Sequence, residues 1–117
     1  MEGSELFLLG ELPGAVDVHV TPSGVRIELR GEIDTVLSDD LDVAVQRVRE
    51  HAMPVTVDAS EVTFIDSTGA SFFARLVRLP NAVAALELAP VVRDLLEITG
   101  IAAHLVVVPA GPQSTTA

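Results

Sequence analysis

The sequence predicts a single α/β domain built on a mixed β-sheet, with an N-terminal hairpin, later parallel strands and helices in the crossover connections. Two observations predict this fold class. Two stretches of alternating apolar residues come first, joined by a short turn, and amphipathic helical stretches then alternate with apolar, strand-like runs. The 117 residues, of which 49% are hydrophobic, suffice for one modest core.

The first half of the chain predicts a hairpin, a helix and a strand. Apolar residues alternate with polar ones over Val16 to Val20 and over Val25 to Leu29, and Thr21 to Gly24 forms the turn between them. From Ser38 to His51 the apolar residues recur at helical spacing, with acidic residues in the first turn and basic residues in the last, as the helix dipole favours. Apolar residues between Val55 and Ile65 predict the next strand.

The second half continues the alternation of helix and strand. A helix follows Ile65 and ends at Pro80. The nearly unbroken apolar run Ala82 to Ala89 predicts a strand buried on both faces of the sheet. Pro90 and Gly100 bracket a short helix, because proline suits the first helical turn and glycine the residue after the last. His104 to Val108 predicts the final strand.

These elements place one domain at residues 15–108, with no repeat or linker dividing it. Residues 1–14 form an N-terminal extension whose apolar run, Leu6 to Leu9, suits an extra strand, a cover for a sheet edge or a contact in a homodimer. Residues 109–117 are small and polar and carry proline and glycine, which predicts a flexible tail.

The charge balance excludes several classes of partner. Acidic residues outnumber basic ones by 17 to 7, so the net charge of -10 repels nucleic-acid phosphates and anionic membrane surfaces. We therefore expect no nucleic-acid partner and no membrane partner. The first five residues include two glutamates and no basic residue, and the run Leu6 to Leu9 is too short for a signal-peptide core or a membrane span, so we expect a cytoplasmic protein.

The most informative motif is Asp66-Ser67-Thr68-Gly69, where a strand stops and a helix begins at once. It places a hydroxyl at a helix N-terminus, where unpaired N–H groups and the positive end of the dipole favour negative charge. Two compatible interpretations follow: a Ser/Thr helix cap, and a hydroxyl that accepts a phosphoryl group. Gly69, which lacks a Cβ, would let a partner's backbone or a nucleotide phosphate approach Ser67 and Thr68.

Two other side-chain clusters are weighed as sites for chemistry. Glu32, Asp34, Asp58 and Asp66 are expected at loops near one sheet edge, where paired carboxylates can serve a hydrolase or hold Mg²⁺. No nucleophile-base pair or phosphate-binding glycine loop accompanies them, so we predict no enzyme and no catalytic residue. The three histidines are scattered without ligand spacing, and we predict no metal site and no cofactor.

Three motifs in register resemble the STAS domain. They are Gly31 to Asp34 after a strand, Phe64 to Gly69 before a helix, and Pro90 to Gly100 near the end. More narrowly, the chain resembles the bacterial anti-sigma factor antagonists. It departs from their pattern in the short connection Leu79 to Ala82, on the side of the domain away from Ser67.

This resemblance implies a function. It implies that Ser67 is phosphorylated by a partner that is both an anti-sigma factor and a serine kinase with bound nucleotide, and that the unphosphorylated form binds this partner and frees a sigma factor. Thr68 is the second choice of acceptor. The implied partner-binding residues are Glu32, Asp34, Asp66, Ser67, Thr68 and Gly69. The alternative is a scaffold or regulatory subunit of a stress-signalling or lipid-transport assembly, roles that other STAS domains have.

Overall fold

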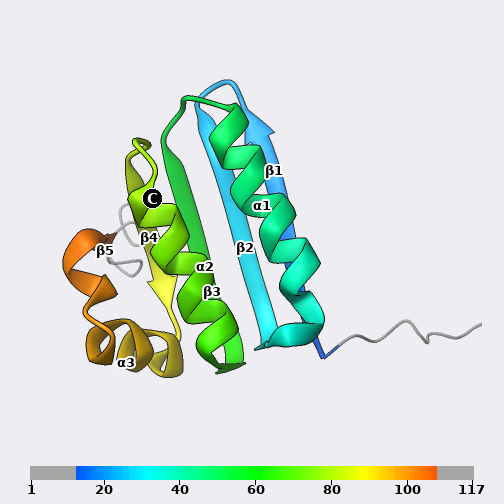
Figure 1. The fold of residues 1–117 in the computed structure, drawn as a ribbon, viewed down its shortest axis with the longest axis vertical. Helices are drawn as coiled ribbons and strands as arrows, with labels where there is room; N and C mark the ends of the chain where they lie inside the picture. The colour runs from blue at the N-terminus through cyan, green and yellow to red at the C-terminus, as the bar shows by residue number, and fades with distance from the viewer. Residues whose placement is uncertain (1–12, 108–117) are drawn as a thin grey trace, which may run out of the picture.

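The computed structural model describes residues 13–107, which form a five-stranded sheet with strand order β1-β2-β3-β4-β5. Strands β1 and β2 form the predicted antiparallel hairpin, and β3, β4 and β5 follow in parallel with β2. The mixed sheet of the predicted α/β class is thereby confirmed (Figure 1). The strands are β1 (Gly14–Thr21), β2 (Gly24–Ile33), β3 (Val55–Ile65), β4 (Val83–Leu88) and β5 (Val106–Val107).

Helices α1 and α2 cover one face of this sheet, and α3 lies near one end of it (Figure 1). Each new parallel strand is added on the same side of the previous one, so right-handed crossovers bring the connecting helices to the same face. The α-helices are α1 (Ser38–Glu50), α2 (Ser67–Arg78) and α3 (Pro90–Ile98). Two short 3₁₀ helices, Thr35–Leu37 and Ile101–His104, precede α1 and follow α3. No helix within residues 13–107 is long and apolar enough to cross a membrane.

The core lies between the sheet and the two covering helices. Strand β2 buries Val25, Ile27 and Leu29, the alternate residues of its helix-facing side. Helix α2 presses Phe72 and Phe73 into this layer, where both are fully buried and their rings meet edge to face with centroids 5.4 Å apart. The apolar residues that recur at strand spacing in β2 and at helical spacing in α2 therefore pack together in one layer.

Two sequence predictions about the last strands are wrong. The run Ala82 to Ala89 is not buried on both faces, because β4 alternates: Val83 and Ala85 are buried, whereas Ala84 and Leu86, which point to the other face, are only half-buried. The far face of the sheet carries no helix among the described residues, so only one face of β4 is packed. The final strand begins at Val106 and not at His104, because the chain continues from α3 into a 3₁₀ helix that includes His104.

Most of the predicted extension, residues 1–14, and all of the predicted tail, residues 109–117, lie outside the described residues, as does Val108. Pro13 and Gly14 are described: the backbone carbonyl of Pro13 accepts a hydrogen bond from the Glu32 N–H at 2.9 Å, and Gly14 pairs with Gly31 as the first residue of β1. The hairpin therefore begins at the very end of the predicted extension.

Asn81 holds together the connections at the end of the sheet where α1 and α2 finish. Its side-chain Nδ2 donates to the carbonyl oxygens of His51 and Met53, both at 2.9 Å, and more weakly to that of Val48 at 3.4 Å. One amide group thus satisfies carbonyls from the end of α1 and from the turn into β3.

Replacing Asn81 by alanine should lower the free energy of unfolding by about 1–2 kcal/mol, because these carbonyls lose their donor. Asn81→Asp should cost more, since it places a carboxylate against the same oxygens. Urea unfolding curves of both variants test this, with Gln46→Ala on the exposed side of α1 as a control expected to change stability by less than about 0.5 kcal/mol. A wild-type midpoint for Asn81→Ala would contradict the role assigned to this amide.

Candidate functional site

The candidate site lies at the sheet edge where the parallel strands β2 and β3 end side by side. Ile33 and Ile65 are register partners, and the N–H of Asp66 donates to the carbonyl of Ile33 at 3.3 Å. The carboxyl ends of parallel strands meet at one edge, which places the residues after β2 beside those that open α2.

Asp66 starts helix α2 as its N-cap. Its backbone is extended, with φ −121° and ψ −162°, and its Oδ1 accepts a hydrogen bond from the N–H of Thr68 at 2.8 Å. The helix cap predicted for a hydroxyl is therefore supplied by the carboxylate, and that interpretation of Ser67 and Thr68 is wrong. Ser67 is the first residue of α2 and is exposed, while Thr68, one residue deeper, is half-buried.

Gly69 is buried in the first turn of α2 and does not open the surface to a partner, contrary to the prediction. A Cβ built at Gly69 would overlap the side chain of Ile65 and press on that of Ile33. The missing side chain therefore lets the first turn of α2 pack directly onto the ends of β2 and β3. Gly69 is a positioning residue that fixes where Ser67 emerges.

Two of the other predicted carboxylates lie at this edge and one does not. Glu32 is exposed next to the last residue of β2, and Asp34 caps the following 3₁₀ helix, its Oδ1 accepting from the N–H of Val36 at 3.1 Å. Asp58 lies in the middle of β3, where its Oδ2 pairs with the guanidinium of Arg26 at 3.2 Å. The predicted loop around Asp58 does not exist because β3 runs unbroken to Ile65.

The edge thus gathers Glu32, Asp34 and Asp66, all acidic. Within residues 13–107, no three histidine, cysteine or carboxylate side chains come close enough together to hold a metal ion. What the arrangement provides is a negatively charged rim around an exposed serine hydroxyl.

The sequence analysis missed two apolar side chains close in sequence to this rim. Val36, in the turn after Asp34, is 71% exposed, and Phe64, which pairs in register with Glu32, is 47% exposed. Large apolar side chains at this exposure are typical of protein contact surfaces. The signal was present in the order Phe64-Ile65, because adjacent strand residues point to opposite faces and only one of them can enter the core.

The outward side of α2 is small and smooth. Ser67 and Ser71 are exposed, and Ala70 and Ala74 are half-buried, at the i, i+3, i+4 and i+7 positions of one helix face. Such a face lets another backbone approach closely. Val36 and Phe64 add exposed apolar area at the same sheet edge, Phe64 on the face of the sheet away from α2.

Comparison with known proteins identifies the fold. The family model described as "Mlab, STAS domain" matches residues 16–109. The chain belongs to the STAS-domain family. This confirms the resemblance seen in the sequence, and the mixed sheet with its three α-helices is the STAS fold.

Three solved structures share this fold at low sequence identity. An anti-sigma factor antagonist from Mycobacterium paratuberculosis superposes with a TM-score of 0.72 and 22% identity, over 88% of this chain and 92% of that chain. The anti-sigma factor antagonist SpoIIAA in its unphosphorylated form gives 0.66 and 18%, over 86% and 93%. The Bacillus cell fate determinant SpoIIAA in its phosphorylated form gives 0.62 and 17%, over 87% and 97%. A search of curated protein sequences found no match.

Replacing Asp66 by alanine should destabilise the STAS domain by about 1 kcal/mol, because the N–H of Thr68 loses its cap. Asp66→Asn keeps an oxygen acceptor and should stay close to wild type. Chemical denaturation of the two variants separates the cap from the charge, and equal losses in both would show that the hydrogen bond is not what stabilises the helix start.

Replacing Gly69 by alanine should cost about 1–3 kcal/mol, because the added methyl group overpacks the contact with Ile65. The matched test is a double-mutant cycle with Ile65→Ala, which removes the obstructing side-chain atoms. The two changes together should cost less than the sum of each alone. Strict additivity would mean that the cost at Gly69 does not arise from this contact.

Proposed function

We propose that this STAS domain is an anti-sigma factor antagonist. In its unphosphorylated form it binds an anti-sigma factor that is also a serine kinase, and it thereby releases a sigma factor in the cytoplasm. Phosphorylation of Ser67 ends this binding. The protein is then a substrate of the kinase and not a catalyst. The observation that carries the proposal is the exposed Ser67 hydroxyl at the first position of α2, inside an acidic rim.

The position of Ser67 supports its role as acceptor over Thr68. Ser67 is exposed, whereas Thr68 is half-buried. In the proposed complex the kinase presents ATP to Ser67, its γ-phosphoryl group forms a bond to the serine Oγ, ADP leaves, and the hydroxyl proton passes to a base on the kinase. Nothing in this step requires a catalytic group from the STAS domain.

The neighbouring carboxylates explain how the phosphate would act. A phosphoserine carries about −1.5 to −2 charge at neutral pH. Asp66 already occupies the Thr68 N–H, so this helix-cap donor is not available to the phosphate, and Glu32 and Asp34 lie along the same edge. The added charge therefore increases an existing negative field. A penalty of ~3 kcal/mol would weaken the complex roughly a hundredfold.

The surface around Ser67 supports a protein as partner. The exposed Val36 and Phe64 would supply apolar contacts, and the small side of α2 would allow close approach of the partner's backbone. The structures of SpoIIAA in unphosphorylated and phosphorylated forms show that a protein with this fold exists in both states, which is consistent with the proposal.

A second candidate function is that of a scaffold or regulatory subunit in a stress-signalling or lipid-transport assembly. It is favoured by the matched family model, which is described for the Mlab STAS domain. A stable high-order assembly in light scattering, or co-purification with a membrane transporter in the absence of any kinase, would favour this function over the phosphorylation switch.

Binding and phosphorylation assays with the partner kinase test the first proposal. Ser67→Ala should bind like the unmodified protein and take up no phosphate, and Ser67→Asp should bind at least tenfold more weakly, because one added negative charge imitates part of the phosphate. Thr68→Ala is the matched control and should still be phosphorylated. Phosphorylation that persists in Ser67→Ala and disappears in Thr68→Ala would transfer the acceptor role to Thr68.

A further inference from the structure

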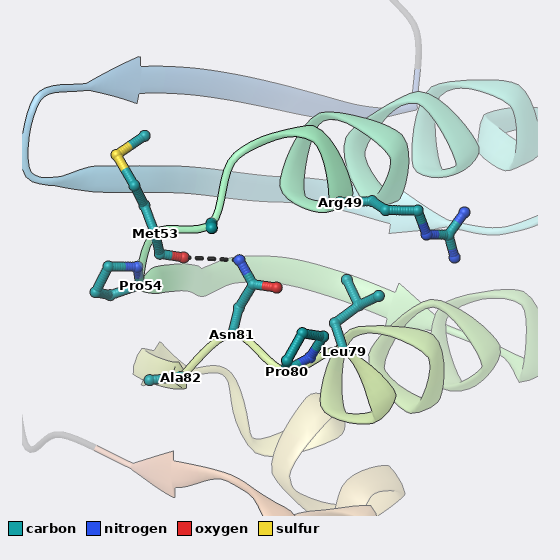
Figure 2. Close-up of a pocket in the computed structure, with 8 residues that line it drawn as sticks. Arg49, Met53, Pro54, Leu79, Pro80, Asn81 and Ala82 are labelled. Atoms are coloured by element: carbon teal, nitrogen blue, oxygen red, sulfur yellow. Dashed lines mark hydrogen bonds between the residues drawn. The ribbon is translucent and has the colours of Figure 1, made fainter.

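A cleft of about 330 Å³ opens at the opposite end of the helices from Ser67, between the connection that follows α1 and the connection that follows α2 (Figure 2). Helix α2 has 12 residues, so at 1.5 Å per residue its two ends are about 18 Å apart. The cleft is therefore separate from the acidic rim, and its volume falls at the lower end of the range for small-molecule sites.

The walls of the cleft are mainly apolar. Met53 and Pro54 lie on one side, Leu79 and Pro80 on the other, and Ala52 and Ala82 complete the lining. Met53 and Leu79 are each half-buried, so part of each side chain faces the open cleft. A molecule that covered these surfaces would remove apolar area from water, which favours binding.

Asn81 links the two walls of the cleft and forms hydrogen bonds with their backbone carbonyls. Its Nδ2 donates to the carbonyls of His51 and Met53, as Figure 2 shows for Met53. The carbonyl of Val48 also accepts from the His51 N–H at 3.1 Å. The Val48 carbonyl at the end of α1 thus already has donors from within the chain, which lowers the electrostatic obstacle to an anion at this end.

Among the described residues that line the cleft, Arg49 is the only charged one. Its side chain leaves α1 on the side of Leu79, away from Met53 and Pro54 (Figure 2). It makes no ion pair with any residue between 13 and 107. The last turn of α1 also carries Arg47 and that of α2 carries Arg78, which add positive charge at this end of the acidic molecule, whereas Arg75 is paired with Asp42 at 2.7 Å.

We propose that this cleft binds a small amphipathic carboxylate. Its apolar chain lies along Met53, Pro54 and Leu79, and its carboxylate receives paired hydrogen bonds from the Arg49 guanidinium, whose planar fork matches a carboxylate. The ligand is an acid with a short aliphatic or aromatic body, because the cleft is open but too small for a long chain. This site is independent of the proposed phosphorylation switch and uses none of its residues.

Titration of the ¹⁵N-labelled protein with sodium octanoate, below its micelle concentration, tests the site by NMR. Octanoate should shift the amide resonances of residues 49–55 and 79–83 in a saturable manner and leave those of residues 64–69 unchanged. Arg49→Gln should weaken octanoate binding roughly tenfold, the change expected from losing one charge-assisted contact. The neutral analogue octanol should bind Arg49→Gln and wild type equally.

Two control variants keep the experiment decisive. Arg47→Gln removes a positive charge from the same helix turn without touching the cleft, and should leave octanoate affinity unchanged. Ala82→Leu should fill the cleft and weaken both octanoate and octanol. Equal octanoate affinity for wild type and Arg49→Gln, or equal binding of octylammonium, would overturn the proposal. Shifts that follow protein concentration and not octanoate would overturn it too, and would assign the cleft to a second copy of the chain.

Discussion

The structure depends on the close contact between the first turn of α2 and the ends of β2 and β3. Ile33 and Ile65 bring the two strand ends together, and Gly69 leaves the space that the Ile65 side chain occupies. Asp66 then turns the chain and caps the helix with a single hydrogen bond. The packing of Ile65, the cap at Asp66 and the missing side chain of Gly69 therefore all lie within five residues. Ser67 lies between them and is exposed. The exposure of this hydroxyl is a consequence of how the core is closed.

The two ends of the covering helices have opposite chemical character. Asp39 and Asp40 open α1 close to the acidic rim, while arginines occupy the last turns of both α1 and α2. This arrangement matches the helix dipoles and so stabilises both helices. It also gives the molecule one face suited to a protein that tolerates an acidic surface, and one end where an organic anion meets positive charge despite the net charge of -10.

Periodicity and terminal residues predicted most of the architecture. Helix α1 was expected from Ser38 and begins there, and Pro90 opens α3 as expected, because these signals act through local backbone chemistry. Strand periodicity was less informative for β3. Register shifts between β2 and β3 let Val62 and Ile65, three residues apart, both face the core, and Phe64 between them turns outward. A regular two-residue strand period cannot predict that Val62 and Ile65 face the same side.

The candidate site was predicted in its position but not in its chemistry. Neither the burial of Gly69 nor the ion pair of Asp58 with Arg26 follows from local sequence, because each depends on a residue from another segment.

The central claim, that Ser67 is the point at which this STAS domain is switched, is tested most directly by intact-mass measurement of the protein purified from its native cells, with the modified residue located by fragmentation. The account predicts one phosphoryl group, on Ser67. A phosphoryl group on any other residue, or an unmodified protein in cells whose partner kinase is active, would contradict it.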